Sequence, residues 1–117
     1  MILQNQLESC LRHDKQTKKI FIGVYARNEL PLILQYPCCF IINTHPRNKP
    51  REHWLAFYYN KNQTCYFFDS YGNKPEFYSL ENYIMFTSKF LIYNKKRIQG
   101  NSTYCGYYCL LFLLFKF

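Results

Sequence analysis

Apolar positions along the chain follow two spacings, one typical of helices and one typical of strands. Leu3, Leu7 and Leu11 recur at helical spacing, which predicts an amphipathic helix over residues 3–13. Runs of β-branched and aromatic residues predict strands at 20–25, 38–43, 53–59, 64–69 and 90–93. In residues 38–43 apolar side chains would lie on both faces of the strand. This strand is therefore expected inside a sheet, with both of its faces covered.

Two further helices are expected in the second half of the chain. Phe77, Leu80 and Ile84 would share one side of a helix over residues 76–86. Residues 105–115 form an almost unbroken apolar run that predicts a helix starting near Cys105. This run is too short for a membrane span, which needs about 20 residues, so no membrane partner is expected.

The third and fourth predicted strands are joined by the short polar loop 60–63, which predicts an antiparallel hairpin. His53 begins the first strand of this hairpin and Asp69 ends the second. The start of one strand lies beside the end of its antiparallel partner. These two side chains are therefore expected to be neighbours in space.

Four residues in the order His53, Asp69, Gln99 and Cys105 match the roles needed for thiol acyl transfer. A thiol at a helix N-terminus ionises more readily and can attack a carbonyl, and His53 would take and return its proton. Asp69 would orient the imidazole. Gln99 would donate a hydrogen bond to the developing oxyanion.

Each of these residues alone has an ordinary structural explanation. Cys105 could be a buried core thiol, His53 a strand-end residue, Asp69 a turn residue and Gln99 a solvated side chain. The hairpin and the predicted helix start bring them into one hypothesis. A metal site is not expected, because Cys105 and Cys109 have no second pair of ligands to complete a zinc site.

Length and composition are consistent with one domain of 117 residues, and the 49% apolar content excludes a disordered chain. Six cysteines could form a disulfide framework, but no signal peptide opens the sequence, so we expect a protein that is not secreted and mostly free thiols.

The net charge of +8 favours a polyanionic partner such as DNA, although a solvated basic surface is an equally valid explanation. The candidate phosphate-contacting residues are basic side chains in three segments: Lys18, Lys19, Arg47, Lys49, Arg51, Lys95, Lys96 and Arg97.

Two blocks of the chain resemble the signature blocks of the adenovirus-type maturation proteases. They are HWLAFYYNKNQTCYFFDSYG at 53–72 and QGNSTYCG at 99–106. FIGVYARNELP and CCFIINT also resemble the preceding strands of that family. The resemblance extends to the wider clan of Ulp-type proteases, which act on ubiquitin-like modifiers.

The resemblance implies an α+β fold of the papain-like type with permuted connectivity. A central helix bearing the cysteine would pack on a mixed, mainly antiparallel sheet, in a single protease domain over residues 1–117. It implies Cys105 as nucleophile, His53 as base, Gln99 as oxyanion donor and Asp69 as the acidic member. Trp54 would wall the substrate cleft, and Gly106 would let the chain turn closely so that the Cys105 backbone N–H also faces the oxyanion.

The resemblance further implies polypeptide substrates with glycine near the scissile bond and a location in the virion and host-cell nucleus. No cofactor is needed for the chemistry, whereas DNA and a viral peptide are implied activators. Residues 88–98 contain no cysteine for a covalent link to such a peptide. Family members continue beyond the last helix, so we expect a truncated or minimal protease, or a partner or second copy that covers this apolar helix.

Three functions are therefore compatible with the sequence. The first is a cysteine endopeptidase that cleaves structural precursors of a virus or virus-like element during particle maturation. The second is a protease for ubiquitin-like modifiers. The third is a catalytically inactive, basic virion protein that binds DNA.

Overall fold

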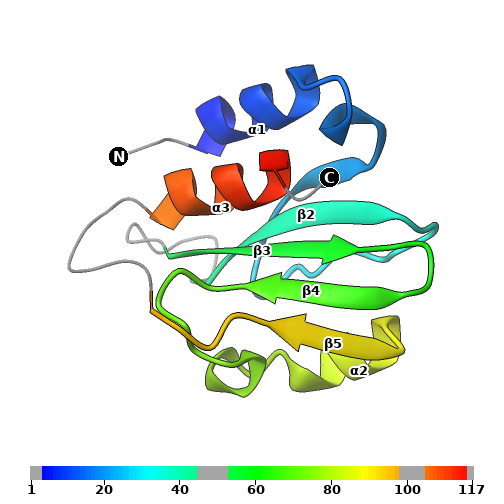
Figure 1. Cartoon of the computed structure of the whole chain (residues 1–117), viewed down its shortest axis with the longest axis vertical. Coiled ribbons are helices and arrows are strands. Elements are labelled where there is room, and N and C mark those ends of the chain that lie inside the picture. Colours follow the sequence, from blue (N-terminus) through cyan, green and yellow to red (C-terminus); the bar gives the residue numbers. More distant parts are fainter. Residues whose placement is uncertain (1–3, 45–52, 98–104, 116–117) are drawn as a thin grey trace.

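Five strands form one mixed sheet in the computed structural model, which describes residues 4–44, 53–97 and 105–115. The strands are β1 (Phe21–Ala26), β2 (Cys38–Asn43), β3 (Trp54–Tyr59), β4 (Thr64–Phe68) and β5 (Phe90–Tyr93). They lie side by side in sequence order (Figure 1). The inner pairs β2–β3 and β3–β4 are antiparallel, and the outer pairs β1–β2 and β4–β5 are parallel.

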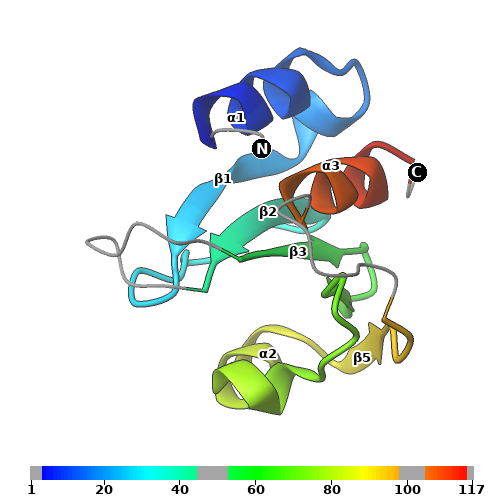
Figure 2. The same ribbon diagram turned by 90° about the vertical axis from the view of Figure 1, so that its left-hand side faces the viewer.

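Helices cover both faces of the sheet. They are α1 (Gln4–His13), α2 (Glu81–Thr87) and α3 (Cys105–Phe115), with 3-10 turns η1 (Thr17–Lys19) and η2 (Pro75–Tyr78). α1 and α3 lie on one face and α2 on the other (Figure 2). This arrangement confirms the predicted α+β fold with the helix that begins at Cys105 packed on the sheet. Within the described residues, no helix has the length and apolar character needed to cross a bilayer.

The sheet separates two apolar cores because alternate residues of each strand face opposite sides. Cys39 and Ile41 of β2 pack with α1 and α3, whereas Phe40 and Ile42 pack with η2 and α2. All six residues of β2 are buried. The prediction of an interior strand covered on both faces is therefore confirmed.

The helix expected over residues 76–86 is wrong in its first part. The chain forms the 3-10 turn η2, then Ser79 adopts a left-handed conformation with φ of 61°, and α2 follows. A 3-10 turn advances three residues per turn, and the left-handed residue ends it, so the helical phase is not continuous. As a result Phe77 is 68% exposed instead of buried, and Tyr78 takes its place in the core.

Candidate active site

The prediction that the side chains of His53 and Asp69 lie close together is confirmed. β3 and β4 pair in register up to Ala56 and Phe68, so Asp69 lies one residue and His53 three residues past the end of the ladder. The His53 Nε2 and Asp69 Oδ1 atoms are 2.6 Å apart. The ring of His53 also stacks on Tyr71, with 4.4 Å between ring centroids. The hairpin thus fixes both the position and the plane of the imidazole.

Asp69 is fully buried, with an exposed fraction of 0%. Its Oδ1 also accepts the Tyr71 backbone N–H at 3.0 Å, and its Oδ2 accepts the Tyr78 hydroxyl at 2.6 Å and the Asn73 backbone N–H at 3.1 Å. Burial raises the pKa of this carboxyl, but the hydrogen bonds from His53, Tyr78 and Tyr71 outweigh burial and leave the pKa below its ordinary value. Asp69 is therefore a carboxylate at neutral pH.

This charge decides the tautomer of His53. A carboxylate only accepts hydrogen bonds, so Nε2 carries the proton that Asp69 receives. In the neutral imidazole the basic nitrogen is then Nδ1. The arrangement suits a base whose Nδ1 exchanges a proton with a nucleophile while Asp69 holds the other side of the ring.

Asn94 braces the backbone of Asp69. Its Oδ1 accepts the Asp69 N–H at 3.0 Å, and its Nδ2 donates to the Asp69 and Lys96 carbonyl oxygens. Gly72 has φ of 75°, and a Cβ placed there would come within 2.7 Å of the Lys96 backbone carbon. Only glycine fits this approach. The turn carrying Asp69 is thereby packed against the segment that follows β5.

Three residues that were not among the predicted site residues also contact Asp69: Tyr71, Tyr78 and Asn94. Tyr78 reaches Asp69 because η2 folds under the hairpin, and burial followed by the hydrogen bond to Asp69 raises the pKa of its hydroxyl. Asn94 reaches Asp69 through the parallel pairing of β5 with β4. Only Tyr71 could have been found from the sequence, because it follows Asp69 by two residues within the predicted turn Ser70-Tyr71-Gly72.

Replacing Tyr78 by phenylalanine is expected to raise the pKa of Asp69, since it removes a donor to the carboxylate. The Tyr78→Phe protein should lose about 1–2 kcal/mol of unfolding free energy at pH 7. A depressed folded-state pKa stabilises the protein above the unfolded value near 4 and stops doing so as the pH falls. The stability gap between Tyr78→Phe and wild type should therefore narrow below about pH 4.

Urea unfolding at a series of pH values measures this gap. Tyr93→Phe is the matched control, because Tyr93 lies on β5 with its ring under the Lys95 ammonium. A Tyr78→Phe gap that stays constant from pH 7 to pH 3 would mean that the hydroxyl contributes packing alone and does not stabilise the charge of Asp69.

The helix start expected at Cys105 is confirmed, because Cys105 is the first residue of α3. One turn later, the Cys109 thiol donates to the Trp54 carbonyl oxygen at 3.2 Å. Trp54 directly follows His53, so this contact holds the first turn of α3 beside the start of β3. The helix N-terminus favours a thiolate at such a position.

Other thiols of the described chain have the opposite environment. Cys38, Cys39 and Cys65 are buried free thiols, which confirms the expectation for them. Burial raises the pKa of Cys38 and of Cys65 to about 12, and it also raises that of Cys39. These three thiols are therefore unreactive at neutral pH.

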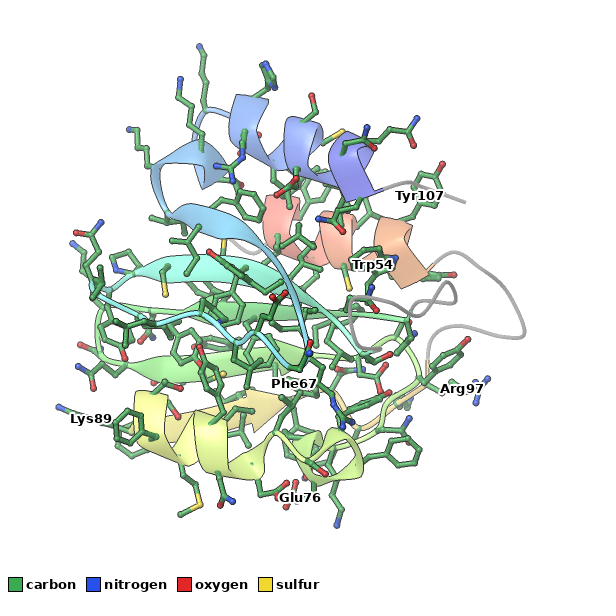
Figure 3. All side chains as sticks on the ribbon, turned by 180° about the vertical axis from the view of Figure 1, so that it is seen from behind. Trp54, Phe67, Glu76, Lys89, Arg97 and Tyr107 are labelled. Carbon is green, nitrogen blue, oxygen red and sulfur yellow. The ribbon has the colours of Figure 1, made fainter. Side chains whose placement is uncertain are left out.

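Two other predicted site residues lie at the same edge of the sheet. Trp54 is 2% exposed and packs between the sheet and α3 (Figure 3), so its role as a cleft wall stays a prediction. Gly106 is buried in the first turn of α3. Gln99 lies outside the described residues, as do Arg47, Lys49 and Arg51.

The described basic candidates form two separate groups. Lys18 and Lys19 are exposed in η1 after α1, and Lys95, Lys96 and Arg97 are exposed after β5. In Figure 1, η1 lies in the upper part of the molecule beside the end of α1, whereas the segment after β5 lies in the lower half. Their role in DNA binding remains a prediction.

Comparison with known proteins identifies the family. The adenovirus endoprotease family matches residues 21–117. The protease of human adenovirus D serotype 9 is 32% identical over 86% of this chain and 51% of its own length. The protease of porcine adenovirus A serotype 3 is 31% identical over 80% of this chain and 54% of its own. The chain therefore spans about half the length of these relatives, and it belongs to the adenovirus endoprotease family.

Proposed function

We propose that this protein is a cysteine endopeptidase that cleaves structural precursor proteins during the maturation of a virus or virus-like element. The observation that carries the proposal is the His53–Asp69 pair, 2.6 Å apart, in a chain of the adenovirus endoprotease family whose α3 is hydrogen-bonded through Cys109 to Trp54, the residue after His53. The relatives are themselves named proteases. A single protease domain, located in the virion and the host-cell nucleus, is part of the proposal.

In the first step the Cys105 thiolate attacks the carbonyl carbon of the scissile peptide bond. The sulfur–carbon bond forms, and the carbonyl oxygen becomes an oxyanion that the Gln99 side chain and the Cys105 backbone N–H stabilise. The carbon–nitrogen bond then breaks. The Nδ1–H of protonated His53 gives its proton to the departing amine, which leaves a thioester on Cys105.

In the second step water attacks the thioester and His53 takes a proton from it. The carbon–sulfur bond breaks, the N-terminal fragment of the substrate leaves with a new C-terminal carboxylic acid, and Cys105 returns as a thiolate while His53 is protonated. Asp69 stabilises the protonated imidazole in both steps and holds its plane. It acts through the ring and does not take up the proton.

Substrates with glycine near the scissile bond are proposed from the family resemblance. Non-specific DNA and a viral peptide are proposed as activators, and the net charge of +8 supports the DNA part. A partner or second copy is proposed to cover α3, where Leu111 and Phe115 are exposed.

The test is hydrolysis of fluorogenic peptides with the pattern hydrophobic-X-Gly-Gly or hydrophobic-X-Gly-X-Gly, with and without DNA. Turnover that disappears on alkylation of Cys105 would support the endopeptidase. Iodoacetamide should label Cys105 much faster than the buried Cys38, Cys39 and Cys65, since their pKa values are raised.

The alternatives predict different outcomes. Preferential cleavage of a protein tail ending in Gly-Gly would identify a protease for ubiquitin-like modifiers. Slow labelling of all thiols, no peptide turnover and salt-dependent DNA binding by the folded protein would identify an inactive DNA-binding protein.

A further inference from the structure

A hollow of about 300 Å³ lies directly beside the imidazole of His53. Of the described residues, those lining it are His53, Tyr71, Asn73, Phe77, Tyr78 and Arg97. None of these lining residues is acidic, and Arg97 is the one whose side chain always carries a positive charge. Figure 3 shows Arg97 at the same edge of the molecule as the first turn of α3.

Aromatic rings form the walls of this hollow and hold each other in place. Tyr71 stacks on His53 at 4.4 Å between centroids, and Phe77 packs edge-to-face on Tyr78 at 5.0 Å. Phe77 is largely exposed although it is a large apolar side chain. Such a surface gains free energy when an apolar group covers it.

Arg97 is positioned by the same turn that carries Asp69. Its guanidinium carbon lies 4.5 Å from the centroid of the Tyr71 ring. A Cβ at Gly72 would come within 2.8 Å of the Arg97 backbone nitrogen, so the two segments are in close contact. The hollow therefore presents a cation over an aromatic wall, at a place fixed relative to His53.

The proposed chemistry decides which part of a substrate meets this hollow. His53 protonates the departing amine, so the residues after the scissile bond must leave on the side of the imidazole. An extended peptide advances about 3.3 Å per residue. Because the hollow adjoins the imidazole, we assign to it the first two residues after the scissile bond.

We propose that this hollow, which we name the leaving-side subsite, selects an apolar side chain next to an acidic one in the first two residues after the scissile bond. This inference rests on the proposed function. Phe77 and Tyr71 would cover the apolar side chain, and the Arg97 guanidinium would pair with the carboxylate. Arg97 thereby becomes a specificity-determining residue.

Matched internally quenched peptides test the selection. They share one sequence up to the scissile bond and carry Leu-Glu, Leu-Gln or Ala-Glu after it. Wild type should prefer Leu-Glu over Leu-Gln by about 3- to 5-fold in kcat/KM, as for a partly exposed ion pair. It should prefer Leu-Glu over Ala-Glu by about 10-fold.

For each variant the result is the ratio of kcat/KM values for two peptides. A general loss of folding or turnover lowers both values and leaves the ratio unchanged. Arg97→Gln should bring the Leu-Glu to Leu-Gln ratio to about one, and the control Lys61→Gln should keep it. Phe77→Ala should lower the Leu-Glu to Ala-Glu ratio, and the control Phe86→Ala, at an exposed position on α2, should keep it.

A binding measurement separates this inference from the proposed function. Labelled peptides that begin with a free amine at Leu-Glu or Leu-Gln correspond to the leaving product, and fluorescence anisotropy measures their affinity without turnover. The Leu-Glu preference in binding, lost in Arg97→Gln, would support the subsite even if no peptide is cleaved. Peptide cleavage with equal rates and equal binding for Leu-Glu and Leu-Gln would overturn the subsite and leave the endopeptidase standing.

Discussion

Replacing Cys105 by alanine is expected to abolish peptide turnover, with a fall in kcat/KM of at least about 10⁴-fold. The reason is that Cys105 begins α3, where a thiolate is favoured, whereas Cys38, Cys39 and Cys65 are buried with raised pKa values. Alanine is favourable within a helix, so the thermal unfolding midpoint should hardly change. Steady-state hydrolysis and circular dichroism on the same preparation measure the two effects.

His53→Ala is the companion variant and should cause a loss of the same order, because the thiolate and its base act as one unit. Cys10→Ala is the control, since Cys10 is an exposed thiol on α1. If Cys105→Ala kept measurable turnover that Cys10→Ala lacked, the nucleophile would have been assigned to the wrong cysteine.

Asp69→Ala is expected to give the largest loss of stability of any single change at the site, about 3 kcal/mol or more. The substitution leaves the Tyr78 hydroxyl, the Tyr71 and Asn73 backbone N–H groups and the His53 ring without their shared acceptor. The thermal midpoint should fall by on the order of 10 °C. Urea unfolding at pH 7 measures the loss, with Glu76→Ala as an exposed control.

Asp69→Asn keeps the shape of the side chain and separates its two roles. An amide oxygen can still accept a hydrogen bond, but it supplies no charge to stabilise protonated His53. We expect a smaller loss of kcat than for Cys105→Ala. A folded Asp69→Asn protein that is as inactive as Cys105→Ala would contradict the orienting role assigned to Asp69.

Local patterns in the sequence predicted the parts of the site that depend on local structure. The polar loop between two β-rich runs was enough to place His53 beside Asp69, because hairpin pairing determines which residues meet. The apolar run after Cys105 was enough to place the start of α3. Both features follow from spacing alone and both are confirmed.

The contacts that complete the site could not be predicted in this way. Tyr78 reaches Asp69 from the 3-10 turn η2, which Ser79 ends in a left-handed conformation where a continuous helix was expected over 76–86. Asn94 reaches Asp69 only through the parallel pairing of β5 with β4. Neither a left-handed serine nor a parallel pairing partner has a periodic signal in the sequence.

The order of these elements along the chain has a consequence during synthesis. The hairpin with His53 and Asp69 is made early, and α3 with Cys105 is made only after α2 and β5. A nascent chain that has already formed its hairpin therefore contains the proposed base and acid but not the proposed nucleophile, Cys105. Under the proposed mechanism, a ribosome that stalls before α3 would leave a fragment unable to cut the proteins around it.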